Sequence, residues 1–199
     1  MCMIDVDDRF IFIHTPKTGG TSVKEYLRND YHTQLFPGRW GHINTTNLRL
    51  NMPNLDYDDY FSFTVMREPF SWLISLFEHR LIPYYQNTYR KANIAAKTKT
   101  FELFIDNFFD SGVPENERLQ SYWFIRDGKV DVDVVWDFEN FPEKVTNHFN
   151  LSLPFGTKNK NVYRYKNHYS SQVIIDKATQ LLEPDIKLYK ELFGNYTNP

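Results

Sequence analysis

Residues 9–30 read RFIFIHTPKTGGTSVKEYLRND, and they combine the signals of three consecutive structural elements. Residues 9–13 are a short apolar run, which is typical of a buried strand. A turn-rich loop with two glycines follows,. From Thr21 the sequence predicts a helix, because Val23 and Leu27 lie four residues apart on one helical face,. A strand, a glycine-containing loop and a helix in this order indicate an α/β fold.

The rest of the chain continues this alternation. Residues 60–66 predict a second strand, and Pro69 occupies the favoured first position of a helix that Pro83 ends,. The further expected elements are helices over 99–110 and 115–125, a strand over 130–138, a helix over 140–149, and a helical segment over 171–193 that Pro184 interrupts. The irregular stretches 31–59 and 155–168 are expected to be mainly loops. Alternating strands and helices favour one α/β domain over 1–199 with a mostly parallel central sheet.

Composition narrows the class of protein. The chain has 199 residues, a net charge of −2 and 41% hydrophobic residues, which suits one soluble globular domain without the basic field of a nucleic-acid binder. Its single cysteine, Cys2, excludes an internal disulfide and a cysteine metal site,. No segment approaches the ~20 apolar residues of a membrane span, and the acidic start MCMIDVDDRF is unlike a signal peptide,. We expect a cytoplasmic protein that binds no nucleic acid.

The loop at residues 16–22, PKTGGTS, has the components of an anion site. The N–H groups that begin the following helix point outward, with the positive end of the helix dipole behind them. Gly19 and Gly20 let the backbone approach a phosphate, and Lys17 adds a positive charge,. Hydroxyl donors in the same loop are Thr18, Thr21 and Ser22. The lysine precedes the glycines, whereas in the Walker A motif it follows them, so a nucleotide kinase is disfavoured without being excluded.

A second candidate anion site begins at Arg67, in the segment REPFSWLIS. Arg67 follows a strand, where open α/β sheets place their ligands, and Ser75 lies on the second turn of the next helix,. An arginine fork and a hydroxyl can together hold a phosphate, although Arg67 could instead pair with Glu68 or Asp59. Two separate anion sites favour a ligand with phosphates at two ends over a nucleoside triphosphate, which needs one cradle and Mg²⁺. No metal site is predicted.

Both motifs resemble those of sulfotransferases that use 3′-phosphoadenosine-5′-phosphosulfate (PAPS). PKTGGTS resembles their 5′-phosphosulfate loop, and the segment from Arg67 to Ser75 resembles their 3′-phosphate motif R-x-P-x-x-R-x-x-S, with Trp72 in place of the second arginine. The segment DFEN at 137–140 resembles the family's RFENL. The likeness is closest to carbohydrate sulfotransferases of the uronyl 2-O type. It implies a three-layer sandwich around a parallel sheet, related to P-loop NTPases, and sulfuryl transfer to a carbohydrate hydroxyl that leaves adenosine 3′,5′-bisphosphate.

The resemblance also implies roles for individual residues. Lys17 contacts the leaving phosphate oxygen, and residues 18–22 hold the 5′-phosphate. Trp40-Gly41-His42 resembles the HGH stretch of 2-O-sulfotransferases, which places the general base at His42 and leaves Trp40 where the other histidine would be. The segment KNHYS, which contains His168, resembles a C-terminal family segment near the nucleotide. Basic residues just before it are expected over the 3′-phosphate or the adenine: Arg164 and Lys166.

Two rival functions remain open at this point. One is a P-loop-like kinase that acts on a small molecule with ATP and Mg²⁺, and the other is a non-catalytic nucleotide-binding relative. The acceptor is also open: a glycan, a lipid-linked sugar, a small alcohol and a tyrosine all carry a suitable hydroxyl. Neither the acceptor nor the oligomeric state follows from the sequence.

Overall fold

In the computed structural model, the described residues are 2–31, 34–35, 42–81, 100–108, 118–151, 168–169, 171–194 and 196. Their contacts divide the chain into two compact units. Unit 1 comprises residues 1–67 and 120–160, and unit 2 comprises residues 68–119 and 161–199. The single domain expected over 1–199 stays a prediction.

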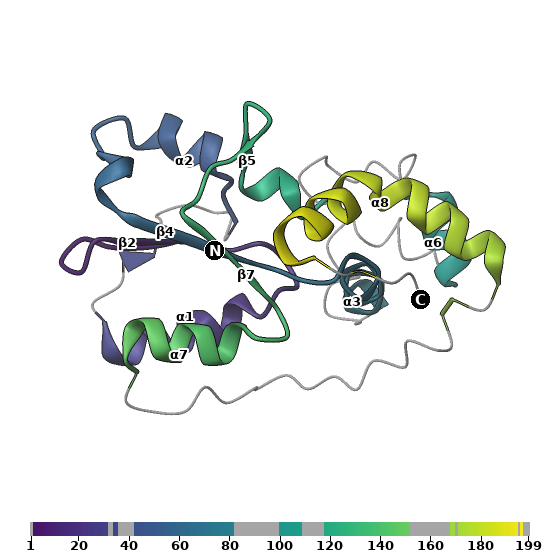
Figure 1. Cartoon of the computed structure of the whole chain (residues 1–199), viewed down its shortest axis with the longest axis horizontal. Helices are drawn as coiled ribbons and strands as arrows, with labels where there is room; N and C mark the ends of the chain where they lie inside the picture. Colours follow the sequence, from purple (N-terminus) through teal and green to yellow (C-terminus); the bar gives the residue numbers. More distant parts are fainter. Residues whose placement is uncertain are drawn as a thin grey trace. The chain divides into compact units, whose positions relative to one another are not determined.

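Unit 1 is built on a five-stranded sheet with the strand order β3-β1-β2-β4-β7 (Figure 1). The strands are β1 (Met3–Asp5), β2 (Phe10–Ile13), β3 (Gln34–Leu35), β4 (Phe61–Met66) and β7 (Val134–Asp137). β2, β4 and β7 pair in parallel, whereas β1 is antiparallel to both β2 and β3. The prediction of an α/β fold with a mostly parallel central sheet is confirmed.

Aromatic and aliphatic side chains form the core of unit 1. Phe10 and Phe12 of β2 and Phe63 and Val65 of β4 alternate onto one face of the sheet, where they form one buried cluster with α1 (Gly20–Asp30) and α7 (Phe141–Phe149). Figure 1 shows these two helices on one side of the sheet. On the other side lie α2 (Thr45–Asn51) and the hairpin of β5 (Ile125–Arg126) and β6 (Lys129–Val130). The sheet therefore lies between layers, and the carboxyl ends of β2, β4 and β7 share one edge.

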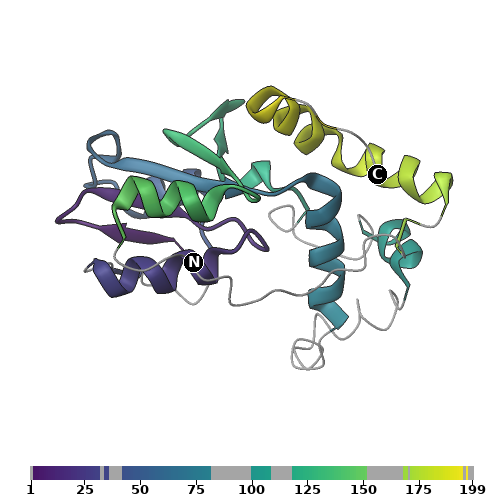
Figure 2. The same cartoon turned by 60° about the horizontal axis from the view of Figure 1, so that its bottom comes forward.

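Unit 2 is helical in its described part. It contains α3 (Pro69–Leu81), α6 (Phe101–Asp106) and α8 (Gln172–Phe193), which share one hydrophobic core. The expected interruption at Pro184 is wrong: α8 continues through this residue as one long helix (Figure 2). Leu182 and Ile186 on either side of Pro184 are buried in the core, and their packing outweighs the backbone hydrogen bond that proline removes.

Other differences from the predicted elements are local. The helix expected over 115–125 is absent from its described part, which holds only a short 3-10 turn at Ser121–Trp123 before β5 begins. The strand β1 and the β5–β6 hairpin were not predicted. Within the described residues, no helix is both long and apolar enough to cross a membrane.

Candidate functional site

The loop between β2 and α1 is held by buried threonine hydroxyls. Thr18 donates its hydroxyl to the carbonyl oxygen of Thr15 at 2.8 Å. The hydroxyl of Thr15 lies 3.1 Å from that of Thr64 on β4, and Thr64 in turn donates to the carbonyl of Ile13 at 2.7 Å. All three threonines are fully buried. These bonds fix the start of the loop to two neighbouring parallel strands, so the loop has a defined shape before any ligand arrives.

Lys17 and Gly19 give the loop its turn. Both have a positive φ, 67° for Lys17 and 78° for Gly19, a conformation that L side chains seldom adopt. Lys17 is a half-buried lysine in this unusual conformation, and such outliers are concentrated at functional sites. The observation supports the choice of Lys17 as a candidate site residue.

The two glycines are required by packing inside the protein. A Cβ on Gly20 would lie 1.9 Å from Cδ2 of His14, and one on Gly19 would lie 2.8 Å from Cζ of Phe141. The sequence suggested only that these glycines admit a phosphate. The structure adds that each lies directly against an aromatic ring of unit 1.

Within the described residues, the cap and the first turn of α1 contain no acidic side chain. The cap is Gly19, which has no side chain to accept a hydrogen bond. The N–H groups of Ser22 and Val23 donate to the carbonyl of Gly19. No acceptor within the described residues contacts the N–H groups of Gly20 and Thr21. The positive end of the helix dipole is therefore available to an external anion.

Among the other α-helices of the described chain, α2, α3, α6 and α8 have a side-chain cap, whereas α7 has no such cap but carries Glu143 in its first turn. The Glu68 carboxylate accepts from the N–H groups of Phe70 and Ser71 at 2.9 and 2.7 Å, which caps α3. Side-chain oxygens also cap α2, α6 and α8; they belong to Asn44, Thr100 and Ser171. The bare start of α1 is thus a local feature of this helix.

His42 is held next to the loop. Its Nδ1 lies 3.0 Å from the carbonyl oxygen of His14, and since a carbonyl can only accept, Nδ1 carries the hydrogen. The neutral ring therefore has its lone pair on Nε2, the atom that can take a proton. The His42 ring also packs against Trp123, with centroids 5.5 Å apart, and against His14 at 4.4 Å.

Positive charge gathers around His14. Burial lowers the pKa of this histidine well below its ordinary 6.5, and the nearby charges of the N-terminus, His42, Lys17 and Lys24 lower it further. His14 therefore stays neutral at physiological pH, and the positive charge near it comes from Lys17 and Lys24.

Arg67 lies at the carboxyl end of β4, beside the loop that follows β2, because these strands are parallel neighbours. The side-chain amide of Gln120 accepts a hydrogen bond from the backbone N–H of Arg67 and donates one to the carbonyl of Arg67, both at 2.8 Å. The Arg67 guanidinium carbon lies 4.5 Å from the ring centre of Phe138. Of the alternative partners, Asp59 pairs with Arg9 at 3.6 Å, and Glu68 caps α3. Arg67 is almost fully buried, with 3% of its surface exposed.

Ser75 and Trp72 belong to unit 2, whereas Arg67 belongs to unit 1. Ser75 lies on α3 and is buried. Trp72, which stands where the resembling motif has its second arginine, is also fully buried in the core of unit 2. It is therefore a core residue of unit 2.

The remaining sequence candidates are placed only in part. Trp40, Arg164 and Lys166 lie outside the described residues. His168 is described: its Nε2 lies 3.2 Å from a carboxylate oxygen of Glu78 on α3. Within the described residues, no cluster of three or more His, Cys, Asp or Glu side chains could hold a metal.

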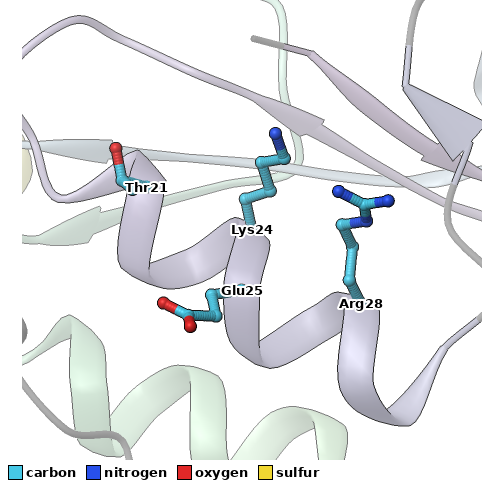
Figure 3. Close-up of a pocket in the computed structure, with 4 residues that line it drawn as sticks. All are labelled: Thr21, Lys24, Glu25 and Arg28. Atoms are coloured by element: carbon cyan, nitrogen blue, oxygen red, sulfur yellow. The ribbon is translucent and has the colours of Figure 1, made fainter.

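An open hollow of about 470 Å³ lies along the exposed face of α1, lined by Thr21, Lys24, Glu25 and Arg28. Lys24 and Arg28 extend to the same side of the helix, and Glu25 points away from them (Figure 3). The hollow begins at the first turn of α1 and therefore continues the basic surface of the loop.

Sequence reasoning did not place Gln120 or Phe138 beside Arg67. Each contacts Arg67 from a distant part of the chain, and no spacing rule relates the three residues. The sequence signals for Phe138 are its position at the end of the predicted strand 130–138, where open α/β sheets place their ligands, and its place in the segment DFEN,.

Comparison with known proteins gives one match. The family model described as "Sulfotransferase family" matches residues 1–193. No curated protein and no solved structure matches the chain significantly.

Proposed function

Since the chain belongs to the sulfotransferase family, whose members transfer sulfuryl groups, we propose that it uses PAPS as the donor and a hydroxyl of a carbohydrate as the acceptor, in the manner of the uronyl 2-O enzymes. The fold that we infer is the family's three-layer sandwich, related to P-loop NTPases. The products are a sulfate ester and adenosine 3′,5′-bisphosphate.

One observation carries the proposal. The start of α1 has neither a side-chain cap nor an acidic residue, it follows a loop that contains Lys17, and it lies beside Arg67 on the neighbouring parallel strand. An uncapped helix start next to a lysine suits a phosphate or a phosphosulfate. A separate arginine at the adjacent strand end suits a second phosphate. These two cationic sites, the start of α1 with Lys17 and the side chain of Arg67, suit a ligand with a phosphate on each side of one ribose.

The residues of the chain divide naturally between the two ends of such a ligand. We assign the 5′-phosphosulfate to Lys17 and the following loop: Thr18, Gly19, Gly20, Thr21 and Ser22. Arg67 takes the 3′-phosphate, with Ser75, Arg164 and Lys166 completing that end. No metal is needed, because the charge is met by lysine, arginine and backbone N–H groups.

His42 is the general base in this proposal. The hydrogen bond from its Nδ1 to the carbonyl of His14 directs the Nε2 lone pair to the acceptor hydroxyl and stabilises the imidazolium that forms after proton transfer. The donor supplies an electrophilic sulfur whose bond to the 5′-phosphate oxygen breaks as the acceptor oxygen bonds to it. The proton of the acceptor passes to Nε2 in the same step.

Lys17 and the N–H groups of Gly20 and Thr21 act on the leaving side. Negative charge grows on the oxygen that joins phosphorus to sulfur, and a fixed ammonium with fixed N–H donors stabilises that charge without reorganisation. The left-handed backbone at Lys17 and the threonine bonds of the loop hold these donors in place before the reaction.

Transfer of radiolabelled sulfate from PAPS to a panel of glycans and small alcohols tests the proposal. We expect Lys17→Ala to lower kcat by ~10²-fold or more, as does loss of an oxyanion donor. His42→Ala should abolish transfer while leaving the affinity for adenosine 3′,5′-bisphosphate near normal. Full activity in Lys17→Ala would overturn the leaving-group role, and a large loss of nucleotide affinity in His42→Ala would make His42 a binding residue. Phosphate transfer from ATP·Mg²⁺ would support the kinase alternative instead.

A further inference from the structure

We propose that the hollow along α1 binds a negatively charged group of the acceptor, and that Lys24 and Arg28 are the residues that hold this group. The ligand that suits the hollow is an acidic glycan, which carries carboxylate or sulfate groups besides its reacting hydroxyl. The inference rests on the proposed function, because it narrows the acceptor of the same reaction. It concerns a surface that lies outside the two nucleotide motifs.

The spacing of residues on α1 places the hollow next to the loop. Gly20, Lys24 and Arg28 follow one another at intervals of four residues, so they lie on about the same face of the helix. Because a helix rises by about 1.5 Å per residue, the two cations start roughly 6 and 12 Å along α1 from its bare beginning. The hollow of about 470 Å³ follows the same stretch of the helix (Figure 3).

Lys24 and Arg28 place two positive charges next to each other. Both side chains extend to the same side of α1, and Glu25, which also lines the hollow, points away from them (Figure 3). Within the described residues, no ion pair involves Lys24 or Arg28. Like charges four residues apart on a helix repel each other and destabilise it. An anion bound between them would replace this repulsion by two favourable contacts.

The charge of Lys24 lies near the proposed reaction centre. Lys24 is half-buried, and after burial its charge is among the influences that lower the pKa of His14. The ring of His14 lies directly against Gly20 and beside the ring of His42, the proposed base. A negative group held by Lys24 is therefore close enough to belong to the molecule whose hydroxyl His42 deprotonates. That molecule is the acceptor.

The chemistry of the hollow favours a glycan over the other acceptors. Its described lining consists of the hydroxyl of Thr21, two cationic side chains and the carboxylate of Glu25, with no apolar residue among them. A lipid-linked sugar or a tyrosine peptide brings apolar groups that gain affinity from apolar contacts, whereas a glycan presents hydroxyls and anions that polar and charged side chains bind. A small neutral alcohol has no group for the two cations.

The test is calorimetric titration of the full chain with two oligosaccharides that differ only in charge. The probes are an oligogalacturonate and the same oligosaccharide after reduction of its carboxylates to alcohols. Titrations are run without nucleotide and with adenosine 3′,5′-bisphosphate, which occupies the cations of the nucleotide site. At ~50 mM salt, where surface charges are weakly screened, we expect the wild type to bind the charged probe about tenfold more tightly than the neutral one. Lys24→Gln/Arg28→Gln should remove most of this difference.

The matched control removes the same amount of charge elsewhere. Lys144→Gln/Lys187→Gln replaces one exposed lysine on α7 and one on α8, so its net charge equals that of Lys24→Gln/Arg28→Gln. The control variant should bind the charged probe as tightly as the wild type does. The comparison separates a site on α1 from a general effect of net charge.

Several results would overturn the inference. The wild type could bind the two oligosaccharides equally or bind neither, or the control variant could lose as much affinity for the charged probe as Lys24→Gln/Arg28→Gln does. Tighter binding of a glutamate peptide of equal charge would assign the hollow to an acidic protein segment instead of a glycan. An equal loss of bisphosphate affinity in Lys24→Gln/Arg28→Gln would assign both cations to the nucleotide. Intact binding of the charged probe by a wild type that does not bind the bisphosphate would contradict only the proposed donor.

Discussion

Gly20 is the position at which a single added carbon tests the described site most severely. A Cβ there would lie 1.9 Å from Cδ2 and 2.1 Å from Nε2 of His14, whereas non-bonded carbon atoms prefer about 3.5–4.0 Å. The ring of His14 would have to move by roughly 1.5–2 Å. That ring stacks on Phe12 and lies beside His42, with centroids 5.8 and 4.4 Å away. The displacement would therefore reach the proposed base.

Two opposing contributions set the expected change in the free energy of unfolding of Gly20→Ala. Overpacking of a filled site destabilises by about 1–3 kcal/mol. Replacement of glycine by alanine in a helix stabilises by about 0.5–1 kcal/mol, and less at Gly20, which begins α1. We therefore expect Gly20→Ala to lower the free energy of unfolding by about 1–2 kcal/mol. In a His14→Ala background the ring is absent, so the same substitution should be neutral or stabilise by up to about 1 kcal/mol.

The measurement is urea unfolding, followed by circular dichroism, of wild type, both single variants and the double variant. The change of sign between the two backgrounds is the diagnostic result, since it isolates the contact between the added carbon and the ring. Equal destabilisation in both backgrounds would refute the reasoning, because an obstacle other than His14 would then be responsible. No destabilisation in the wild-type background would mean that the loop and the ring are farther apart than described.

Three further outcomes follow from the same geometry. Gln120→Ala should lower the free energy of unfolding in urea by about 2–4 kcal/mol, because it leaves the buried N–H and carbonyl of Arg67 without the amide partner. Gln120→Leu fills the space but also lacks the amide, so it should destabilise by a similar amount. A loss below about 0.5 kcal/mol in either variant would contradict this expectation. The free energy of unfolding of the wild type should fall as the pH drops from about 7 to 5, because the pKa of His14 is lowered in the folded state and the unfolded chain therefore takes up a proton on His14 first,. The urea midpoint of His14→Gln should change less over this interval. Identical pH profiles for the wild type and this variant would exclude His14 as the cause. Glu68→Ala should cost about 1 kcal/mol by uncapping α3, and an unchanged thermal midpoint would show that its two hydrogen bonds add nothing.

Local signals explain which elements could be predicted from the sequence. The strands around Phe12 and Phe63 were predictable because their apolar runs are buried, and α3 was predictable from its helical stripe and initial proline. The hairpin of β5 and β6 was missed although Asp127-Gly128 is a strong turn signal, with φ values of 52° and 76°,. Its strands are only two residues long, so no alternation marks them.

In the candidate site, features that are contiguous in sequence were predictable, whereas contacts between distant residues were not. The loop around Lys17 was recognisable because all of its anion-binding parts are contiguous in sequence. The amide of Gln120 reaches the main chain of Arg67 across 53 positions, and the Phe138 ring reaches both Arg67 and Gly19. Such contacts arise from the pairing of strands, which sequence spacing does not encode. The hydrogen bond between His42 and the carbonyl of His14 belongs to the same class.

The central claim is that one site holds two phosphates with Arg67 at the second, and calorimetric titration with adenosine 3′,5′-bisphosphate tests it most directly. We predict binding in the range of about 1–10 μM for the wild type, no comparable binding of ATP·Mg²⁺, and at least ~10-fold weaker binding by Arg67→Ala, since an arginine–phosphate contact is lost. Absence of binding by the folded wild type, or equal affinity in Arg67→Ala, would contradict the account.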